Sequence, residues 1–441
     1  MSESLEISAR HVVRQLADAG FIAFYAGGCV RDMLRAKPPH DYDIATNARP
    51  EQVQKLFKRT IAVGAHFGVV CVLEGGAEFE VASFRSDGAY LDGRHPEEVI
   101  FSSPEHDAAR RDFTVNGMFF DPIKGELIDF VGGKGDLEAH LLRAIGNPAD
   151  RFREDRLRML RAVRFATVLG FEIDPATWNA VCENAPHIHE VSPERIREEL
   201  VKIFLSPGRV RGFDLLDQSG LMREVLPEIE KLKGCEQPPQ FHPEGDVFVH
   251  TRRMIELLPA EVSLPLVFSV LFHDIGKPGT FSCDPQEQRI RFNGHDKLGA
   301  EMTAGIMERL RFSRKETDAT VEGVAQHMVF KDVQQMRISK LKRFMSRETF
   351  EDEMELHRVD CASSHGMLDN YEFLKSKSAE FATAPLIPEP LLTGRDLIEL
   401  GLRPGPHFKE ILEAVQSRQL ESTLSDRSGA IEFVKAEFLH P

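Results

Sequence analysis

The sequence predicts an α+β protein, in which a head with a mixed β-sheet and helices precedes domains built of helices. Up to residue 148, short strand-like runs alternate with glycine turns and amphipathic stretches. From Asp150 onward, apolar residues recur at helical spacing. The 441 residues, of which 42% are hydrophobic, are enough for two to four domains.

The first elements surround a glycine turn. Residues 4–19 predict an amphipathic helix, and residues 21–25 predict a short strand that leads into Gly27-Gly28. Glycines let backbone amides approach a phosphate closely, and the residues after this pair favour the start of a helix. The turn is therefore a candidate phosphate-binding element.

Two aspartates follow on the next predicted strand, residues 41–45. Asp41 and Asp43 are two residues apart, so in a strand both carboxylates point to one face. Two adjacent carboxylates near a triphosphate make a site for two divalent metal ions. One ion activates an attacking hydroxyl and the other neutralises leaving pyrophosphate, which is what nucleotidyl transfer needs.

Glycine- and proline-containing breaks in the sequence delimit the remaining head elements and the domains. Residues 50–57 predict a helix, and residues 66–73 and 78–84 predict two strands joined at Gly75-Gly76. Proline- and glycine-rich breaks farther along mark linkers. The expected domains are residues 1–148, 149–235, 236–384 and 385–441.

Composition limits the compartment and the partners. The six cysteines are scattered without a Cys-x-x-Cys pair, which favours reduced thiols in the cytoplasm. No apolar run approaches the length of a membrane span, and the acidic start lacks the features of a signal peptide, so we expect no membrane partner. The net charge of −15 opposes loose binding to RNA, but residues 151–164 carry six arginines against two acids.

The glycine turn and the aspartate pair together resemble the nucleotidyltransferases of the polymerase-beta superfamily. The strings Gly-Gly-x-Val-Arg-Asp and His40-Asp41-Tyr42-Asp43-Ile44-Ala45-Thr46 look like the bacterial-type tRNA nucleotidyltransferase and poly(A) polymerase family. The resemblance implies a polymerase-beta-like head with Mg²⁺ at Asp41 and Asp43, and Glu80 as a third catalytic acid on a neighbouring strand. It also implies CTP and ATP as substrates, tRNA and not DNA as partner, and a tail that contacts tRNA.

Two more head segments match that family. Arg110-Arg111-Asp112-Phe113-Thr114-Val115-Asn116-Gly117 resembles a segment associated with ribose recognition, and the guanidinium fork of arginine suits a triphosphate. By the resemblance, Gly28, Arg31 and Arg111 hold the triphosphate and sugar. Residues 87–96 resemble a flexible loop that helps such enzymes move from C addition to A addition.

The neck matches the family's nucleobase-selecting motif. Residues 153–165 have helical periodicity, which makes Asp155 and Arg158 neighbours on one helix face. An aspartate accepts hydrogen bonds and an arginine only donates them, so such a pair can read the Watson–Crick edge of a base. The resemblance implies that this pair selects C or A, and that Arg161 and Arg164 contact the nucleotide.

The third predicted domain resembles an HD phosphohydrolase around His273-Asp274-Ile275-Gly276-Lys277. The family pattern needs a histidine upstream and an aspartate downstream, and further imidazoles hold a second metal ion. Imidazole with carboxylate suits a transition metal such as Mn, Fe, Ni or Co better than Mg. The expected metal ligands are His250, His273, Asp274, His295, His327 and Asp360.

These features predict a CTP- and ATP-dependent tRNA nucleotidyltransferase that adds or repairs the 3'-CCA end, with 2',3'-cyclic phosphodiesterase or phosphatase activity in the HD domain. Three alternatives remain open: an enzyme that adds only the terminal A, a poly(A) polymerase, and an HD phosphohydrolase whose head only binds RNA. Poly(A) polymerases typically carry Gly-Arg-Arg-Phe after the aspartate pair, and residues 63–70 depart from it. The sequence does not indicate the oligomeric state.

Overall fold

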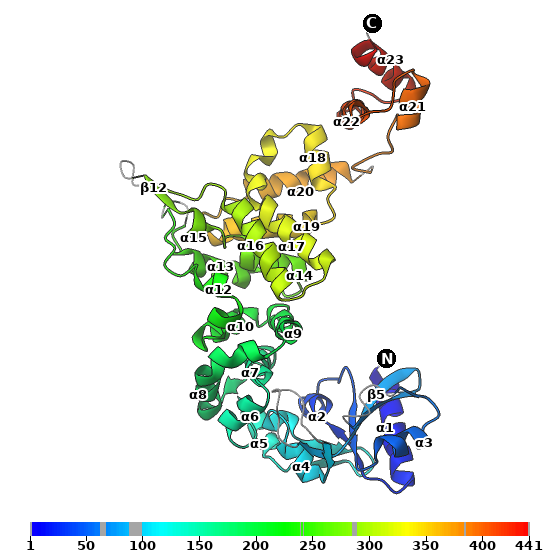
Figure 1. The fold of residues 1–441 in the computed structure, drawn as a ribbon, viewed down its shortest axis with the longest axis vertical. Helices are drawn as coiled ribbons and strands as arrows, with labels where there is room; N and C mark the ends of the chain where they lie inside the picture. Colours follow the sequence, from blue (N-terminus) through cyan, green and yellow to red (C-terminus); the bar gives the residue numbers. More distant parts are fainter. Residues whose placement is uncertain are drawn as a thin grey trace. The chain divides into compact units, whose positions relative to one another are not determined.

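The computed structural model describes residues 2–61, 68–87, 99–238, 240, 242–284, 289–382 and 385–439. Most of the expected loop 87–96 and part of segment 63–70 lie outside these ranges. The chain forms two compact units, Met1–Pro227 and Glu228–Pro441 (Figure 1). Within the described residues, no helix is both long and apolar enough to cross a membrane.

A seven-stranded mixed sheet organises the start of the first unit. Its strand order is β3-β4-β5-β2-β1-β8-β9, in which only β2 and β5 pair in parallel. The strands are β1 (Ala23–Ala26), β2 (Asp43–Thr46), β3 (Thr60–Ile61), β4 (Val69–Glu74), β5 (Ala77–Ser83), β8 (Phe119–Asp121) and β9 (Glu126–Ile128). A separate hairpin pairs β6 (Arg85–Asp87) with β7 (Val99–Phe101). The predicted mixed α/β head is confirmed.

Alternation along the central strands separates a packed face from the site face. Tyr25, Ile44 and Val81 are neighbours in register and are fully buried. Adjacent residues point to opposite faces of a sheet, so Asp43 projects from the other side. The helices of the head are α1 (Ser2–Asp18), α2 (Gly28–Leu34), α3 (Pro50–Leu56), α4 (Pro104–Ala109), η2 (Thr114–Asn116) and α5 (Gly133–Glu138). Helices α1 and α3 pack against the sheet (Figure 1).

The rest of the first unit is helical, apart from the short strands β10 (Leu141–Leu142) and β11 (Glu172–Ile173). Its helices are α6 (Pro148–Glu154), α7 (Leu157–Leu169), α8 (Pro175–Asn184), η3 (Ala185–Glu190), α9 (Pro193–Phe204), α10 (Arg209–Gln218) and α11 (Leu221–Val225). The expectation of one continuous helix over residues 153–165 is wrong. The chain ends α6 at Glu154 and adopts an extended conformation at Asp155, with φ −143° and ψ 106°, before α7 begins.

The described residues of the second unit are mostly helical, as predicted, and they also include an antiparallel pair of strands, β12 (Ser282–Asp284) and β13 (Arg289–Arg291). After α12 (Pro227–Glu230), its helices are α13 (Val247–Leu257), α14 (Leu264–Phe272), α15 (Lys277–Thr280), α16 (His295–Arg309), α17 (Arg314–Gln326), η4 (His327–Gln335), α18 (Ile338–Met345), α19 (Phe350–Ser363), α20 (Asp369–Phe381), α21 (Gly394–Glu399), α22 (His407–Leu420) and α23 (Arg427–Phe438). The last three helices share a core of their own that includes Leu397, Ile411 and Val434.

Candidate functional site

Three carboxylates meet at the start of β2. Asp41 lies just before the strand, so the prediction that both aspartates belong to it is wrong by two residues. Tyr42 between them is buried, with its ring centroid 4.9 Å from that of Tyr25, and both aspartates are exposed. The parallel register pairs Ile44 with Val81, and one residue earlier it places Glu80 beside Asp43 on the same face.

The electrostatics of this acidic cluster favour a cation. Although the Asp43 side chain reaches solvent, neighbouring protein atoms partly desolvate its carboxyl and raise its pKa to about 6. The negative charges of Asp41 and Glu80 contribute further, while Arg111 opposes the rise. Like charges placed this close disfavour simultaneous ionisation. A divalent ion bound by oxygen ligands removes that repulsion, so the donor set fits Mg²⁺.

Gly27 lies where the turn meets this cluster. Its φ of +73° is in the left-handed region, and a Cβ there would be 3.0 Å from Nη1 of Arg111 and 3.8 Å from Oδ2 of Asp43. Gly28, which we expected to bind the nucleotide, begins α2, and its Cβ would meet only ordinary contacts. Gly27 is thus the glycine that the backbone requires, because it lets an arginine and a carboxylate approach the same turn.

The two adjacent arginines of the 110–117 segment share one buried partner. Arg110 pairs with Oδ1 of Asp107 at 2.7 Å, and Arg111 pairs with Oδ2 at 3.1 Å. Burial would raise the pKa of Asp107, but the two guanidiniums outweigh it and hold this pKa below its ordinary value. Arg111 also donates from Nη1 to the carbonyl oxygen of Asn116 at 3.3 Å. These contacts hold the Arg111 side chain next to Gly27.

A buried hydrogen-bond chain joins α2 to α7 through the 110–117 segment. Arg31 donates to Oδ1 of Asn116 at 2.8 Å, and Nδ2 of Asn116 donates to Oδ1 of Asp112 at 3.2 Å. Nε of Arg161 then donates to Oδ2 of Asp112 at 2.8 Å. Burial would raise the pKa of Asp112, but Arg161 and Asn116 outweigh it and lower this pKa to about 2. Two expected nucleotide-binding arginines, Arg31 and Arg161, are therefore linked by hydrogen bonds through Asn116 and Asp112.

The ring of Phe165 lies beneath three guanidiniums. Those of Arg31, Arg161 and Arg164 are 5.4, 5.3 and 4.0 Å from its centroid, within the range of cation–π attraction. Arg164 also pairs with Glu199 of α9 at 2.6 Å. Phe165 is therefore part of the site, although it is not among the residues predicted from the sequence. Its position, one residue after Arg164, could have indicated this stacking role only if the other two arginines were already known to be nearby.

Asp155 and Arg158 do not form the expected pair on one helix face. Oδ1 of Asp155 accepts from the backbone amide of Leu157 at 3.0 Å, and Oδ2 accepts from Arg195 at 2.8 Å. Arg158 is buried and donates to Glu154 at 2.8 Å. The break between α6 and α7 causes the difference, because it removes the helical spacing that would have aligned the two side chains.

The six arginines of residues 151–164 form no bare basic track. Each has an ion-pair partner: Glu154 for both Arg151 and Arg158, Asp150 for Arg153, Glu190 for Arg156, Asp112 for Arg161 and Glu199 for Arg164. Their charge is therefore largely compensated within the first unit. RNA phosphates would have to exchange with these carboxylates or use other cations.

In the second unit, the six expected metal ligands converge. The rings of His250 and His273 are 5.4 Å apart, and those of His295 and His327 are 5.1 Å apart. Asp274 lies among them, 2.9 Å from Nε2 of His273 and 3.4 Å from Nε2 of His295. All five are buried, and Asp360 of α19 lies 3.1 Å from Nε2 of His250.

Backbone carbonyls orient three of these imidazoles. The Nδ1 atoms of His273, His295 and His327 lie 2.9, 2.7 and 2.6 Å from carbonyl oxygens three residues earlier. A proton on each Nδ1 leaves the Nε2 lone pair free to bind a metal. In the described structure, the Nε2 atoms of His250 and His273 are buried and make no well-aligned hydrogen bond. This is expected of nitrogens that bind a metal ion. The donor set fits a transition metal.

Charges within the HD cluster are strongly coupled. Burial would lower the pKa of His250, but the carboxylates of Asp360 and Glu244 outweigh it and raise this pKa to about 9. Burial lowers the pKa of His327 to about 4, with help from the neighbouring His273. Burial would raise the pKa of Asp274, yet His273 and Lys277 hold it well below its ordinary value.

Sequence reasoning missed three contributors to this cluster. His242 and Glu244 group with His250 as possible ligands, although their Pro- and Gly-containing surroundings indicated only a linker. Gly276 is required because a Cβ there would lie 2.3 Å from the backbone oxygen of His295. The glycine of the His273–Lys277 segment could have signalled this close approach.

Comparisons with known proteins match three segments of the chain to family models. Residues 23–143 match the family model described as the poly A polymerase head domain. Residues 170–233 match the probable RNA and SrmB-binding site of polymerase A, and residues 247–358 match the HD domain. The matched ranges cover the sheet with its acidic cluster, the helices after α7, and five of the six expected HD ligands.

Similar proteins extend the match to nearly the whole chain. The CCA-adding enzyme of Lactobacillus helveticus is 31% identical over 432 residues, which cover 97% of this chain and 96% of that relative. A crystal structure of the Bacillus stearothermophilus CCA-adding enzyme in complex with CTP shares 25% identity, with a TM-score of 0.72 over 97% of both chains. The Thermotoga maritima CCA-adding enzyme complexed with tRNA has the same fold, at 19% identity and a TM-score of 0.61 over 97% of this chain and 94% of its own.

Coverage differs among the relatives. The chain spans 55% of the length of the first two curated relatives it matches, both CCA-adding enzymes and 42% and 41% identical over 219 residues. The Lactobacillus helveticus relative, by contrast, aligns with nearly all of the chain, including both units. On that alignment, this chain belongs to the family of CCA-adding enzymes.

Proposed function

We propose that this chain is a nucleotidyltransferase that adds or repairs the 3'-CCA end of tRNA from CTP and ATP. The observation that carries the proposal is the meeting of Asp41, Asp43 and Glu80 at the start of β2, next to Gly27 and Arg111. Three acids beside an arginine suit a triphosphate with its divalent ions.

The residues of the head divide the chemical work. Asp41 and Asp43 would hold Mg²⁺, which when bound supplies activation of the tRNA 3'-hydroxyl and neutralisation of the leaving pyrophosphate. Glu80 adds a third acidic ligand. Gly28, Arg31 and Arg111 bind the triphosphate and sugar, and the position of Arg111 on Asp107 pre-orients its guanidinium toward the acidic cluster.

Selection of the base falls to the break between α6 and α7. Asp155 and Arg158 offer an acceptor and a donor. Besides backbone groups, each contacts one side chain, Arg195 and Glu154 respectively, that a base edge can replace. Arg161 and Arg164 lie one and two turns farther along α7 and support the nucleotide. Replacing Asp155 with alanine should reduce discrimination between CTP or ATP and UTP or GTP in competition assays. Unchanged selectivity would mean that other residues recognise the base.

The proposal extends to domains, partners and compartment. We propose four domains at residues 1–148, 149–235, 236–384 and 385–441, with tRNA bound along the helical parts and no DNA or membrane partner. Support comes from the match of residues 170–233 to an RNA-binding model and from the separate core of the last three helices. A cytoplasmic location rests on the scattered cysteines, which fit a reducing compartment.

One assay separates full CCA addition from its rivals. Purified protein is incubated with tRNA that ends before CCA, and with each labelled nucleoside triphosphate alone and in combination. The proposal expects two cytidines with CTP alone and a terminal A only after them. Addition of A alone to tRNA ending in CC would indicate an A-adding enzyme, long A tails would indicate a poly(A) polymerase, and no addition would reject the nucleotidyltransferase.

A second activity is favoured by the converging imidazoles of the second unit. We propose that His250, His273, Asp274, His295, His327 and Asp360 hold one or two transition-metal ions of the Mn, Fe, Ni or Co group. When bound, such an ion supplies a nucleophilic hydroxide for phosphoester hydrolysis at neutral pH. The expected substrates are 2',3'-cyclic phosphates and 2'-phosphates at RNA ends. Failure of metal-replete protein to hydrolyse 2',3'-cyclic AMP or 2'-phosphorylated RNA ends would reject this activity.

A further inference from the structure

Glu244 reaches the metal centre from outside the expected ligand set. Its side chain is 2% exposed, and one oxygen, Oε1, contacts two imidazoles. Nδ1 of His250 lies 2.7 Å from this oxygen, and Nδ1 of His242 lies 2.9 Å from it. A buried carboxylate shared in this way is well placed to orient both rings.

The contact fixes which nitrogen of His250 is free. In the neutral ring, when Nδ1–H donates a hydrogen bond to Glu244, Nε2 carries the lone pair, and this nitrogen lies 3.1 Å from Asp360. The hydroxyl of Ser363 also lies near Nδ1, at 3.3 Å, so it is the weaker partner. His250 differs here from His273, His295 and His327, whose Nδ1 atoms contact backbone carbonyls.

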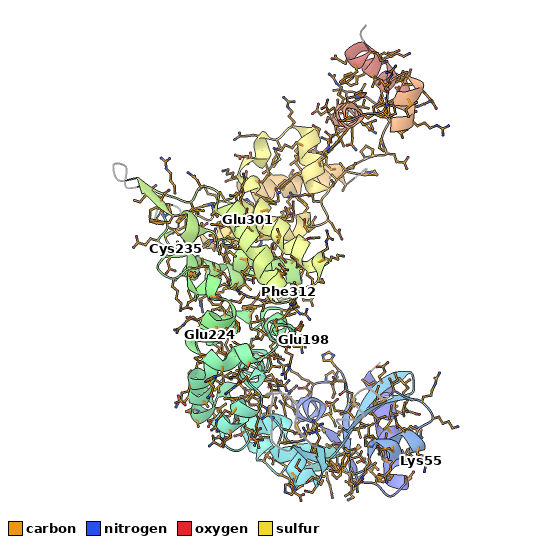
Figure 2. All side chains as sticks on the ribbon, viewed as in Figure 1. Lys55, Glu198, Glu224, Cys235, Glu301 and Phe312 are labelled. Carbon is orange, nitrogen blue, oxygen red and sulfur yellow. The ribbon has the colours of Figure 1, made fainter. Side chains whose placement is uncertain are left out.

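Two hydrogen bonds join the two ends of the segment that carries Glu244. The amide of Gly234 donates to Oδ2 of Asp246 at 2.7 Å, and the amide of Val247 donates to the oxygen of Cys235 at 3.1 Å. Cys235, labelled in Figure 2, stands at the start of this loop. The same segment supplies Gln237, whose Oε1 accepts from Nζ of Lys277 at 2.6 Å.

Through Lys277, Gln237 contacts the part of the metal centre that contains Asp274. Nζ of Lys277 lies 2.6 Å from Oδ2 of Asp274, so Gln237 and Asp274 share one ammonium group. Both side chains of the loop are buried and contact residues next to, or within, the expected metal ligands. Partners in this outer position commonly fix ligand orientation and raise metal affinity.

We propose that Glu244 is a positioning residue of the metal centre, acting through His250. The inference rests on the proposed metal site but adds a residue outside the ligand set that the HD pattern supplies. Glu244 sets the tautomer and the ring orientation of His250, so its loss weakens metal binding without removing a ligand. His242 shares the carboxylate and lies at the rim, with its side chain 17% exposed.

Metal affinity tests the proposal independently of hydrolysis. Full-length protein is stripped of metal and titrated with Co²⁺ against a chelator, and the visible absorption bands of the bound ion are recorded. Glu244→Ala should lower Co²⁺ affinity by roughly 10- to 100-fold and alter the bands. Glu244→Gln keeps the shape and one acceptor, so it should fold and show a smaller loss in the same direction.

The matched control removes a carboxylate–imidazole pair elsewhere. Glu224 lies 2.8 Å from Nε2 of His189 in the first unit and is labelled in Figure 2. Glu224→Ala should bind Co²⁺ as the wild type does. If both Glu244 variants matched the wild type in affinity and spectrum, the proposal would be wrong. A wild type that binds Co²⁺ but does not hydrolyse phosphoesters would reject only the proposed activity, whereas one that binds no Co²⁺ would reject the metal centre and this inference together.

Discussion

At the scale of single residues, two glutamates on β5 provide a direct test of the acidic cluster. Glu78 and Glu80 are two residues apart, both exposed, and project from the same face of the strand. Only Glu80 is in register with Asp43 and contributes to its raised pKa. Position along the strand, and not the chemistry of the side chain, separates the two.

Glu80→Ala should therefore reduce nucleotide addition by at least tenfold, equivalent to about 1.4 kcal/mol of barrier. Glu78→Ala is the matched control and should stay within about twofold of the wild type. The measurement is the rate of CTP incorporation at saturating Mg²⁺. Equal rates for the two variants would remove Glu80 from the catalytic acids.

The glycine turn allows a second comparison between neighbours. Gly27→Ala places a methyl group at φ +73° and 3.0 Å from the Arg111 guanidinium, so it should destabilise the first unit by about 1–2 kcal/mol. Gly28→Ala adds a methyl at a helical position with ordinary contacts and should be neutral or stabilising by up to about 1 kcal/mol. Urea unfolding followed by circular dichroism measures both, and a reversed order would contradict the assigned geometry.

At the scale of elements, the Asp112–Arg161 pair joins the 110–117 segment to α7. The pKa of Asp112 is about 2 in the folded chain against an ordinary 3.8, so the pair stabilises the fold above pH 3.8. That contribution, on the order of 2 kcal/mol, is lost as the pH falls toward 2.

The stability gap between the wild type and Asp112→Asn should accordingly be largest near pH 7 and shrink as the pH drops toward 2, because the protonated wild-type carboxyl resembles the amide. The urea midpoint measured across this range tests it. Asp150→Asn, which removes an exposed partner of Arg153, should leave the midpoint nearly unchanged at every pH. A pH-independent gap for Asp112→Asn would show that the ion pair does not carry the effect.

The elements also show where sequence reasoning succeeded and failed. The exposure of Asp41 and Asp43 on either side of the buried Tyr42 follows the predicted two-residue alternation, although the strand itself begins only at Asp43. The break at Asp155 could not be predicted, because apolar residues continue the helical period past it. The Asp155 side chain accepts hydrogen bonds from the backbone amide of Leu157 and from the distant Arg195. These contacts stabilise the break, and no local pattern reveals them.

The HD cluster likewise contains residues that the sequence predicts and residues that it does not. Its six expected ligands follow a recognisable order along the chain, and the structure brings them together. Glu244 was missed because it lies in a proline- and glycine-containing stretch that indicates only a loop. Its contacts are with His242 and His250, two and six residues away, and they depend on how the chain turns into α13, which no spacing rule predicts.

At the scale of the whole molecule, the two sites belong to separate compact units. His273→Ala removes an imidazole from the metal cluster and should abolish phosphohydrolase activity while CCA addition stays nearly intact. Asp41→Ala should do the reverse. Elemental analysis should find less bound transition metal in the first variant and a wild-type amount in the second. Parallel loss of both activities in either variant would mean that the units do not work independently.

The central claim is that one acidic site in the head builds the tRNA 3' end. The most direct measurement is to sequence the 3' ends of tRNA, initially lacking CCA, after incubation with CTP, ATP and Mg²⁺. Wild-type protein should leave ends reading CCA, and Asp43→Ala, with folding confirmed by circular dichroism, should reduce their formation more than about a hundredfold, or ~2.7 kcal/mol of barrier. CCA ends formed at near wild-type rate by Asp43→Ala, or no CCA ends from the wild type, would contradict the account.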